Sequence, residues 1–173
     1  MSDTRAIMLT MTTYGTWLRG DRRGWIDQGI VMPPEPEIER ADRGRMKHPP
    51  FLFHRDQMLN VGEMMGRALV ERLEQVVLAV AVQRWHVHFV VDGARQPVGA
   101  IVKCAKDSVR YGLRPGRPIW GTGYDKRFCF DDASTRGRVR YVELHNERMG
   151  WEARPWEFIT SVEEYLRTFT RGR

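Results

Sequence analysis

Residues 76–91 read VVLAVAVQRWHVHFVV, and this stretch decides the fold. Residues 76–82 are apolar and mostly β-branched, in a run too short for a helix, so they predict a buried central strand. Residues 83–84 allow a tight connection, and residues 86–91 begin with alternating histidine and apolar side chains, as a second strand does. The sequence therefore predicts a β-hairpin near the middle of the chain.

The segments on either side of this hairpin complete the fold prediction. Hydrophobic periodicity predicts strands over 6–13 and 126–130, and helices over 58–73, 100–113, 133–149 and 161–170. This β-α-β-β-α-β order predicts an α+β fold, the ferredoxin-like split β-α-β, with an antiparallel four- to five-stranded sheet and helices on one face. We expect a single domain over 1–173, with the glycine- and proline-rich residues 14–50 as a long loop insertion.

Composition limits the classes of function. The chain has 173 residues and a net charge of +6, with a pI of about 9.7. A small basic domain favours polyanionic partners, with nucleic acid ahead of an anionic membrane surface. The longest apolar run, residues 76–82, is too short to cross a bilayer, and two isolated cysteines form no disulfide framework. These features exclude an integral membrane protein and a secreted disulfide scaffold, and they predict a cytoplasmic location.

The sharpest chemical feature is the sequence His86-Val87-His88 in the second strand of the hairpin. Side chains at i and i+2 of a strand face the same way, so the two imidazoles lie side by side, as a divalent metal ion requires. Val87, Phe89 and Val91 face the other way and suit burial under helices, which places the histidines on the polar, open face. The alternative is a pair of partly exposed histidines without a ligand.

A second feature lies in the helix predicted over 133–149. Tyr141 and His145 are four residues apart and share one face of that helix. His145 can therefore complete a three-histidine metal site with His86 and His88, with Tyr141 one turn away. Asn146 points further round the helix and is the weaker candidate for the third ligand. A tyrosine beside a metal ion is a competent nucleophile towards a phosphodiester.

Positive charge is concentrated between residues 103 and 128, which include seven basic and two acidic residues. Basic side chains neutralise phosphates, and the interleaved aromatic residues Trp120 and Tyr124 can stack on unpaired bases. The alternative is a solvated helix face followed by a basic loop. The residues that we predict to bind nucleic acid are Lys103, Lys106, Arg110, Arg117, Lys126 and Arg127.

These motifs resemble those of a known family. The histidine–hydrophobic–histidine pair followed by the helical Tyr141 resembles the HUH endonuclease pattern of single-tyrosine insertion-sequence transposases, in particular the REP-associated tyrosine transposases. Residues 9–24 and 47–50 are similar to one branch of this family, and residues 141–150 are similar to the family's ending after the tyrosine. The resemblance covers roughly residues 6–157. His145 stands where family members usually carry Gln or Asn.

The resemblance implies an enzyme that cleaves and rejoins single-stranded DNA, with a hairpin near the cut. Tyr141 would attack the scissile phosphate, forming a 5′-phosphotyrosine link and releasing a free 3′-OH. Mg²⁺ or Mn²⁺ would bind at His86, His88 and His145. The family pattern leaves open whether Tyr141 acts within one chain or across a homodimer.

Two other functions are compatible with the same residues. One is a domesticated relative that binds DNA without cutting it. The other is a metal-dependent phosphoesterase that uses water as the nucleophile and forms no covalent intermediate. The presence or absence of a covalent protein–DNA adduct distinguishes these alternatives from a transposase.

Overall fold

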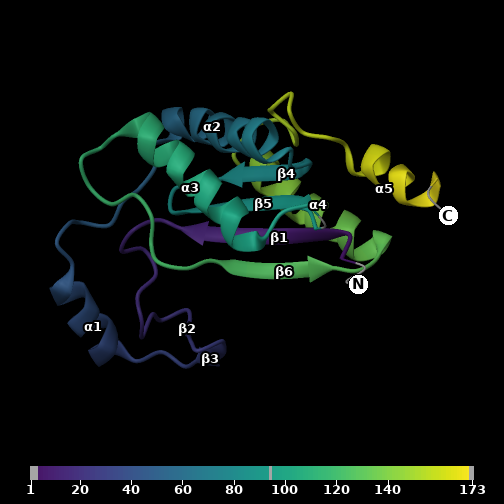
Figure 1. The fold of residues 1–173 in the computed structure, drawn as a ribbon. Helices are drawn as coiled ribbons and strands as arrows, with labels where there is room; N and C mark the ends of the chain where they lie inside the picture. Colours follow the sequence, from purple (N-terminus) through teal and green to yellow (C-terminus); the bar gives the residue numbers. More distant parts are fainter. Residues whose placement is uncertain (1–3, 94, 172–173) are drawn as a thin grey trace.

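The computed structural model describes residues 4–93 and 95–171 of the chain. A four-stranded antiparallel sheet with the strand order β4-β5-β1-β6 forms its centre (Figure 1). The elements in chain order are β1 (Ala6–Thr12), β2 (Trp25–Asp27), β3 (Ile30–Met32), α1 (Pro36–Arg45), α2 (Arg55–Leu73), β4 (Val77–Val82), β5 (His86–Asp92), α3 (Val98–Leu113), β6 (Asp125–Cys129), α4 (Asp132–Arg148) and α5 (Val162–Arg171). The predicted β-α-β-β-α-β core and α+β class are confirmed, with four strands in the main sheet. None of the helices in the described residues is long and apolar enough to cross a membrane.

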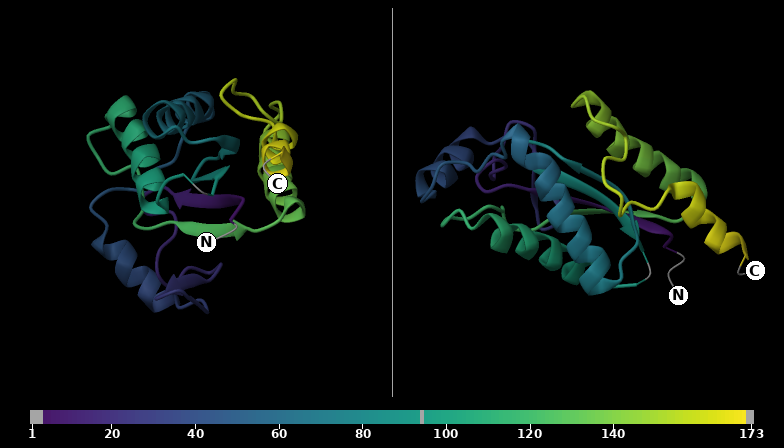
Figure 2. Two further views of the ribbon diagram at one scale, coloured as in Figure 1. Left: turned by 45° about the vertical axis from the view of Figure 1, so that its right-hand side comes forward. Right: turned by 90° about the horizontal axis from the view of Figure 1, so that it is seen from above.

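Helices lie on both faces of this sheet. α2 and α3 cover one face, as predicted, whereas α4 and α5 cover the other (Figure 2). The expectation of helices on one face alone is therefore wrong. The reason lies in β4 and β5, which are buried along their whole length and present apolar side chains to both faces. Two separate hydrophobic cores result, one on each side of the sheet.

The place of β4 in the sheet also differs from the prediction. Residues 76–82 were expected to form a central strand, but β4 lies at the edge of the sheet, and among the described strands it pairs only with β5. Its apolar character reflects burial between α2 and α4 rather than strand neighbours on both sides. An apolar run thus indicates that both faces of a strand are covered, but it does not show that the strand lies at the centre of the sheet.

Residues 14–50 contain regular structure and are not one long loop. β2 and β3 form a separate two-stranded hairpin, and α1 follows it. Gln28 and Gly29 connect the two strands with φ values of 48° and 84°, the positive values that a tight hairpin turn requires. Pro36 begins α1, a position where its missing N–H is not needed. β2 and β3 have three residues each, and α1 has no buried residue, so neither element gives a periodic apolar pattern.

A buried asparagine attaches α4 to the edge of the sheet. The side chain of Asn146 is only 1% exposed, and its Nδ2 donates hydrogen bonds to the carbonyl oxygens of Val80 in β4 and Ala153 after the helix, at 2.8 and 3.0 Å. An edge strand lacks ladder partners on one side, so a side-chain donor here satisfies an otherwise unpaired carbonyl. The bond fixes the end of α4 against β4.

We expect Asn146→Ala to lower the free energy of unfolding by about 1–3 kcal/mol, because it leaves a buried carbonyl without its donor. Urea denaturation followed by circular dichroism measures this change. The matched control is Asn60→Ala on the exposed face of α2, which should change stability by less than about 0.5 kcal/mol. Equal effects of the two substitutions would contradict the role assigned to Asn146.

Candidate metal and nucleic-acid site

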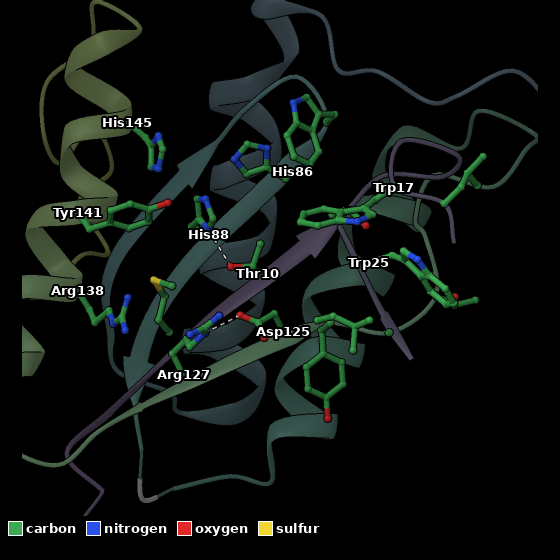
Figure 3. Close-up of a pocket in the computed structure, with 18 of the residues that line it drawn as sticks. Thr10, Trp17, Trp25, His86, His88, Asp125, Arg127, Arg138, Tyr141 and His145 are labelled. Atoms are coloured by element: carbon green, nitrogen blue, oxygen red, sulfur yellow. Dashed lines mark hydrogen bonds and ion pairs between the residues drawn. The ribbon is translucent and has the colours of Figure 1, made fainter. Parts of the chain in front are cut away.

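Two elements bring three histidines together. β5 pairs with β1, with His86 opposite Thr12 and His88 opposite Thr10. Both imidazoles point to the face that α4 covers, since alternate residues of a strand face the same way. His145 approaches from α4, and its ring centre lies 6.1 Å from that of His86 and 5.0 Å from that of His88 (Figure 3). The structure therefore gathers the three predicted ligands in one cluster.

The two strand histidines are more buried than the sequence suggested. His86 is 8% exposed and His88 is 6% exposed, so the expectation that they lie on an open face is wrong. The physical reason is the docking of α4 on this side of the sheet, which the predicted one-sided arrangement lacked. The histidines lie instead at the inner wall of a pocket.

Burial keeps these imidazoles uncharged. It lowers the pKa of His86 to about 4, with smaller contributions from His145 and Arg23. It lowers the pKa of His88 to about 3, with contributions from the other two histidines. Burial, and then the positive charge of Arg148, also lowers the pKa of His145. Neutral imidazole is the form that binds a metal ion, so the cluster needs no deprotonation before it can do so at neutral pH.

The donor set fits a divalent cation, although the rings are not arranged around one. Among residues 4–93 and 95–171 no group of three or more His, Cys, Asp or Glu side chains is positioned to hold a metal ion. Imidazoles that share an ion at about 2.0–2.2 Å have ring centres roughly 5 Å apart. Here the ring centres of His86 and His88 are 4.7 Å apart. Nδ1 of His86 and Nε2 of His145 are buried and have no hydrogen-bond partner in the described part of the chain, and both can serve as ligands.

Neighbouring side chains orient two of the rings. Oγ1 of Thr10 lies 2.8 Å from Nδ1 of His88, and Nε2 of Gln83 lies 3.0 Å from Nδ1 of His145. Contacts of this kind hold a ring in place and select which of its nitrogens is free. In both residues the contact occupies Nδ1 and leaves Nε2 available as a metal ligand.

Tyr141 is the fourth member of the cluster. It lies one turn before His145 on α4, with its ring centre 4.8 Å from that of His145 and 5.6 Å from that of His88. The side chain is 43% exposed and points from the helix towards the histidines (Figure 3). Asn146, the weaker candidate ligand, faces the core and does not reach the cluster.

The cluster forms one wall of a cavity of 870 Å³. The cavity lies over the face of β1, β5 and β6 that α4 flanks, and residues 17–19 and 25–26 line its other side (Figure 3). Three arginines line it: Arg19 is paired with Asp42, and Arg127 is paired with Asp125. Arg138 lies one turn before Tyr141 and makes no ion pair or hydrogen bond with any described residue, which leaves its guanidinium available to a ligand.

Of the six basic residues predicted to bind nucleic acid, only Arg127 lines this cavity. α3, which carries Lys103, Lys106 and Arg110, packs on the opposite face of the sheet. Lys106 donates to the carbonyl oxygens of Gly121 and Gly123, and burial lowers its pKa. Arg117 donates to the carbonyl of Pro49 and stacks on neighbouring aromatic rings. Lys126 is exposed on the edge strand β6. DNA binding by these five residues stays a prediction.

Several cavity residues were not predicted. Arg138 could have been found, because it precedes Tyr141 by three residues and so shares its helix face. Trp17, Trp25 and Trp85 were not among the predicted site residues. Residues 14–50 were expected to form a long loop insertion, and Trp85 lies between the predicted connection at residues 83–84 and the strand that begins at His86. Their convergence depends on how that segment folds back over the sheet.

The fold of this chain is similar to that of a solved transposase structure. No protein-family model matches the sequence, and no curated protein matches it either. A solved structure of a REP-associated tyrosine transposase bound to a REP hairpin is similar to 98% of this chain and 81% of its own, with a TM-score of 0.51 and 13% sequence identity. A crystal structure of a putative transposase from Deinococcus radiodurans is similar over 82% of this chain and 91% of its own, with a TM-score of 0.41 and 11% identity. The chain thus has the fold of a REP-associated tyrosine transposase, in agreement with the resemblance in its sequence.

Proposed function

We propose that this protein is a metal-dependent single-stranded DNA transesterase, a transposase that cleaves and rejoins DNA through Tyr141. The observation that carries the proposal is the convergence of Tyr141 with His86, His88 and His145 at one wall of an arginine-lined cavity. A tyrosine hydroxyl, three neutral imidazoles and guanidinium groups are the parts that nucleophilic attack on a phosphodiester needs.

Each part has a role in the proposed reaction. Mg²⁺ or Mn²⁺, held by the three histidines, would supply Lewis-acid polarisation of the scissile phosphate. The Tyr141 oxygen attacks phosphorus, a tyrosine–phosphate bond forms, and the bond from phosphorus to the 3′ oxygen breaks. The phenol proton passes to solvent, which reaches this half-exposed side chain, and the departing oxygen takes up a proton as a 3′-OH. Rejoining reverses these steps, and no external energy source is needed.

The DNA partner follows from charge and from the related fold. The chain has a net charge of +6, and Arg127 and Arg138 lie in the same cavity as the nucleophile. We expect them to neutralise phosphates near the cut. The solved transposase of the same fold is bound to a REP hairpin, which supports hairpin-containing DNA as the substrate class here.

The replacement Tyr141→Phe tests the proposal, because it removes one oxygen from a half-exposed residue. We expect the variant to fold and to bind single-stranded DNA with unchanged affinity, but to lose both strand cleavage and the covalent adduct. Incubation with labelled single strands from the flanks of the gene and Mn²⁺, followed by denaturing electrophoresis, measures both products.

The exposed Tyr111 on α3 provides the matched control, since Tyr111→Phe should retain adduct formation. An adduct with the Tyr141→Phe variant would mean that another tyrosine attacks. Cleavage without any adduct in the wild-type protein would favour the phosphoesterase, and binding without cleavage would favour the non-catalytic relative.

The neutral histidines predict a pH dependence of stability in the metal-free protein. Unfolded histidine titrates near pH 6.5, whereas burial lowers the folded pKa of His86 to about 4 and that of His88 to about 3. Below pH 6.5 the unfolded state therefore binds more protons, and stability falls with pH until the folded pKa values are reached. Urea denaturation in EDTA should show a loss on the order of 1–2 kcal/mol per histidine between pH 6.5 and pH 5.

The matched comparison uses His88→Gln and His54→Gln, of which only the first alters a buried ring. The slope between pH 6.5 and pH 5 should decrease in His88→Gln and stay as in the wild type in His54→Gln. A wild-type stability that does not change over this range would show that the histidines are not held in the neutral form.

A further inference from the structure

Trp17 stands at the cavity with much of its ring uncovered. It is 42% exposed, although a large aromatic side chain is more stable when buried. The polar edge of the indole is satisfied, because its N–H donates to the carbonyl of Gly24 at 2.8 Å. What remains uncovered is aromatic surface, and it lines the cavity opposite α4 (Figure 3). We propose that this surface is a stacking site for an unpaired nucleobase next to the phosphate that Tyr141 attacks.

The ring of Trp17 is fixed in place before any ligand arrives. The guanidinium of Arg23 lies 4.8 Å from the centre of the Trp17 ring and 4.6 Å from that of Trp85, so it joins the two indoles. Arg23 is itself held by both carboxylate oxygens of Asp21, at 2.7 and 2.6 Å, and by the carbonyl of Thr16. Binding a base to an already ordered ring loses little side-chain entropy.

The Trp17 ring lies close to the metal ligands, so a base stacked on it would be near the cut and not in a distant part of the DNA. Trp85 lies between Trp17 and the histidines, with its ring centre 6.0 Å from that of Trp17 and 4.1 Å from that of His86. One indole thus separates the stacking surface from the metal ligands. Tyr124, also 42% exposed, lines the same cavity from the segment before β6 and can support a neighbouring base.

The positive charge around Trp17 favours an aromatic ligand that also carries negatively charged phosphates. Arg19, Arg127 and Arg138 line the cavity, and Arg138 makes no ion pair or hydrogen bond with the described residues. Exposed aromatic rings beside cationic side chains are the combination that binds unpaired bases and their phosphates. The ligand is therefore a nucleobase of a single strand. This inference rests on the proposed function for its substrate, but it concerns binding and does not require cleavage.

The test compares Trp17→Ala, Trp17→Phe and Phe130→Ala in DNA binding without metal. Phe130 is the matched control, because it is 60% exposed and does not line the cavity. Fluorescence anisotropy in EDTA, with labelled single strands that contain the cut site, should show that Trp17→Ala weakens binding roughly ten- to a hundredfold. Trp17→Phe should recover most of the affinity because it keeps a stacking ring, and Phe130→Ala should bind like the wild type.

Removing single bases from the DNA identifies the partner of Trp17. Abasic substitution at one position beside the cut should weaken binding to the wild-type protein by the same factor and leave binding to Trp17→Ala unchanged. Trp17→Ala binding as tightly as the wild type would overturn the inference, as would the absence of any abasic position coupled to Trp17. If either result accompanied normal adduct formation, the proposed function would stand and only the stacking site would fall. Coupling at one position without an adduct would support the stacking site and count against the transesterase.

Discussion

The docking of α4 against β4 and β5 is the interaction on which the candidate site depends. β5 alone presents two histidines on a sheet face, and α4 alone presents a tyrosine and a histidine on a helix face. The hydrogen bond from Asn146 to Val80 and the apolar contacts of Val139 and Val142 place the two faces against each other. Two adjacent residues of α4 thus have different roles, because Asn146 anchors the helix to β4 and His145 faces the cavity.

The same docking sets the chemistry of the cluster. By covering the histidines it keeps them neutral, and it leaves Nδ1 of His86 and Nε2 of His145 buried without partners. An unpartnered buried polar atom lowers stability by about 1–3 kcal/mol. A ligand that binds only the folded state would offset this loss. The arginines that face the cavity, and the fixed indole of Trp17, surround the cluster with groups suited to a single-stranded polyanion.

The spacing of residues along the sequence predicted those parts of the fold and the site that lie within a single strand or helix. The alternation of His86 and His88 on a strand, and the spacing of Tyr141 and His145 on a helix, follow from the periods of regular structure. The order of strands does not, so β4 was expected at the centre of the sheet. Charge along the sequence likewise does not show on which face of the sheet a residue lies, so it could not reveal that α3 and the histidine cluster are on opposite faces. Trp17 and Arg23 belong to a segment whose path is set by tertiary contacts.

We propose that His86, His88 and His145 form one metal site beside Tyr141. The most direct test is a crystal structure of the protein with Mn²⁺, examined by anomalous diffraction. We expect a single strong peak with ring nitrogens of all three histidines at about 2.0–2.2 Å, a distance typical of histidine bound to a metal ion. A peak held by other residues, or by only one of the three histidines, would contradict it.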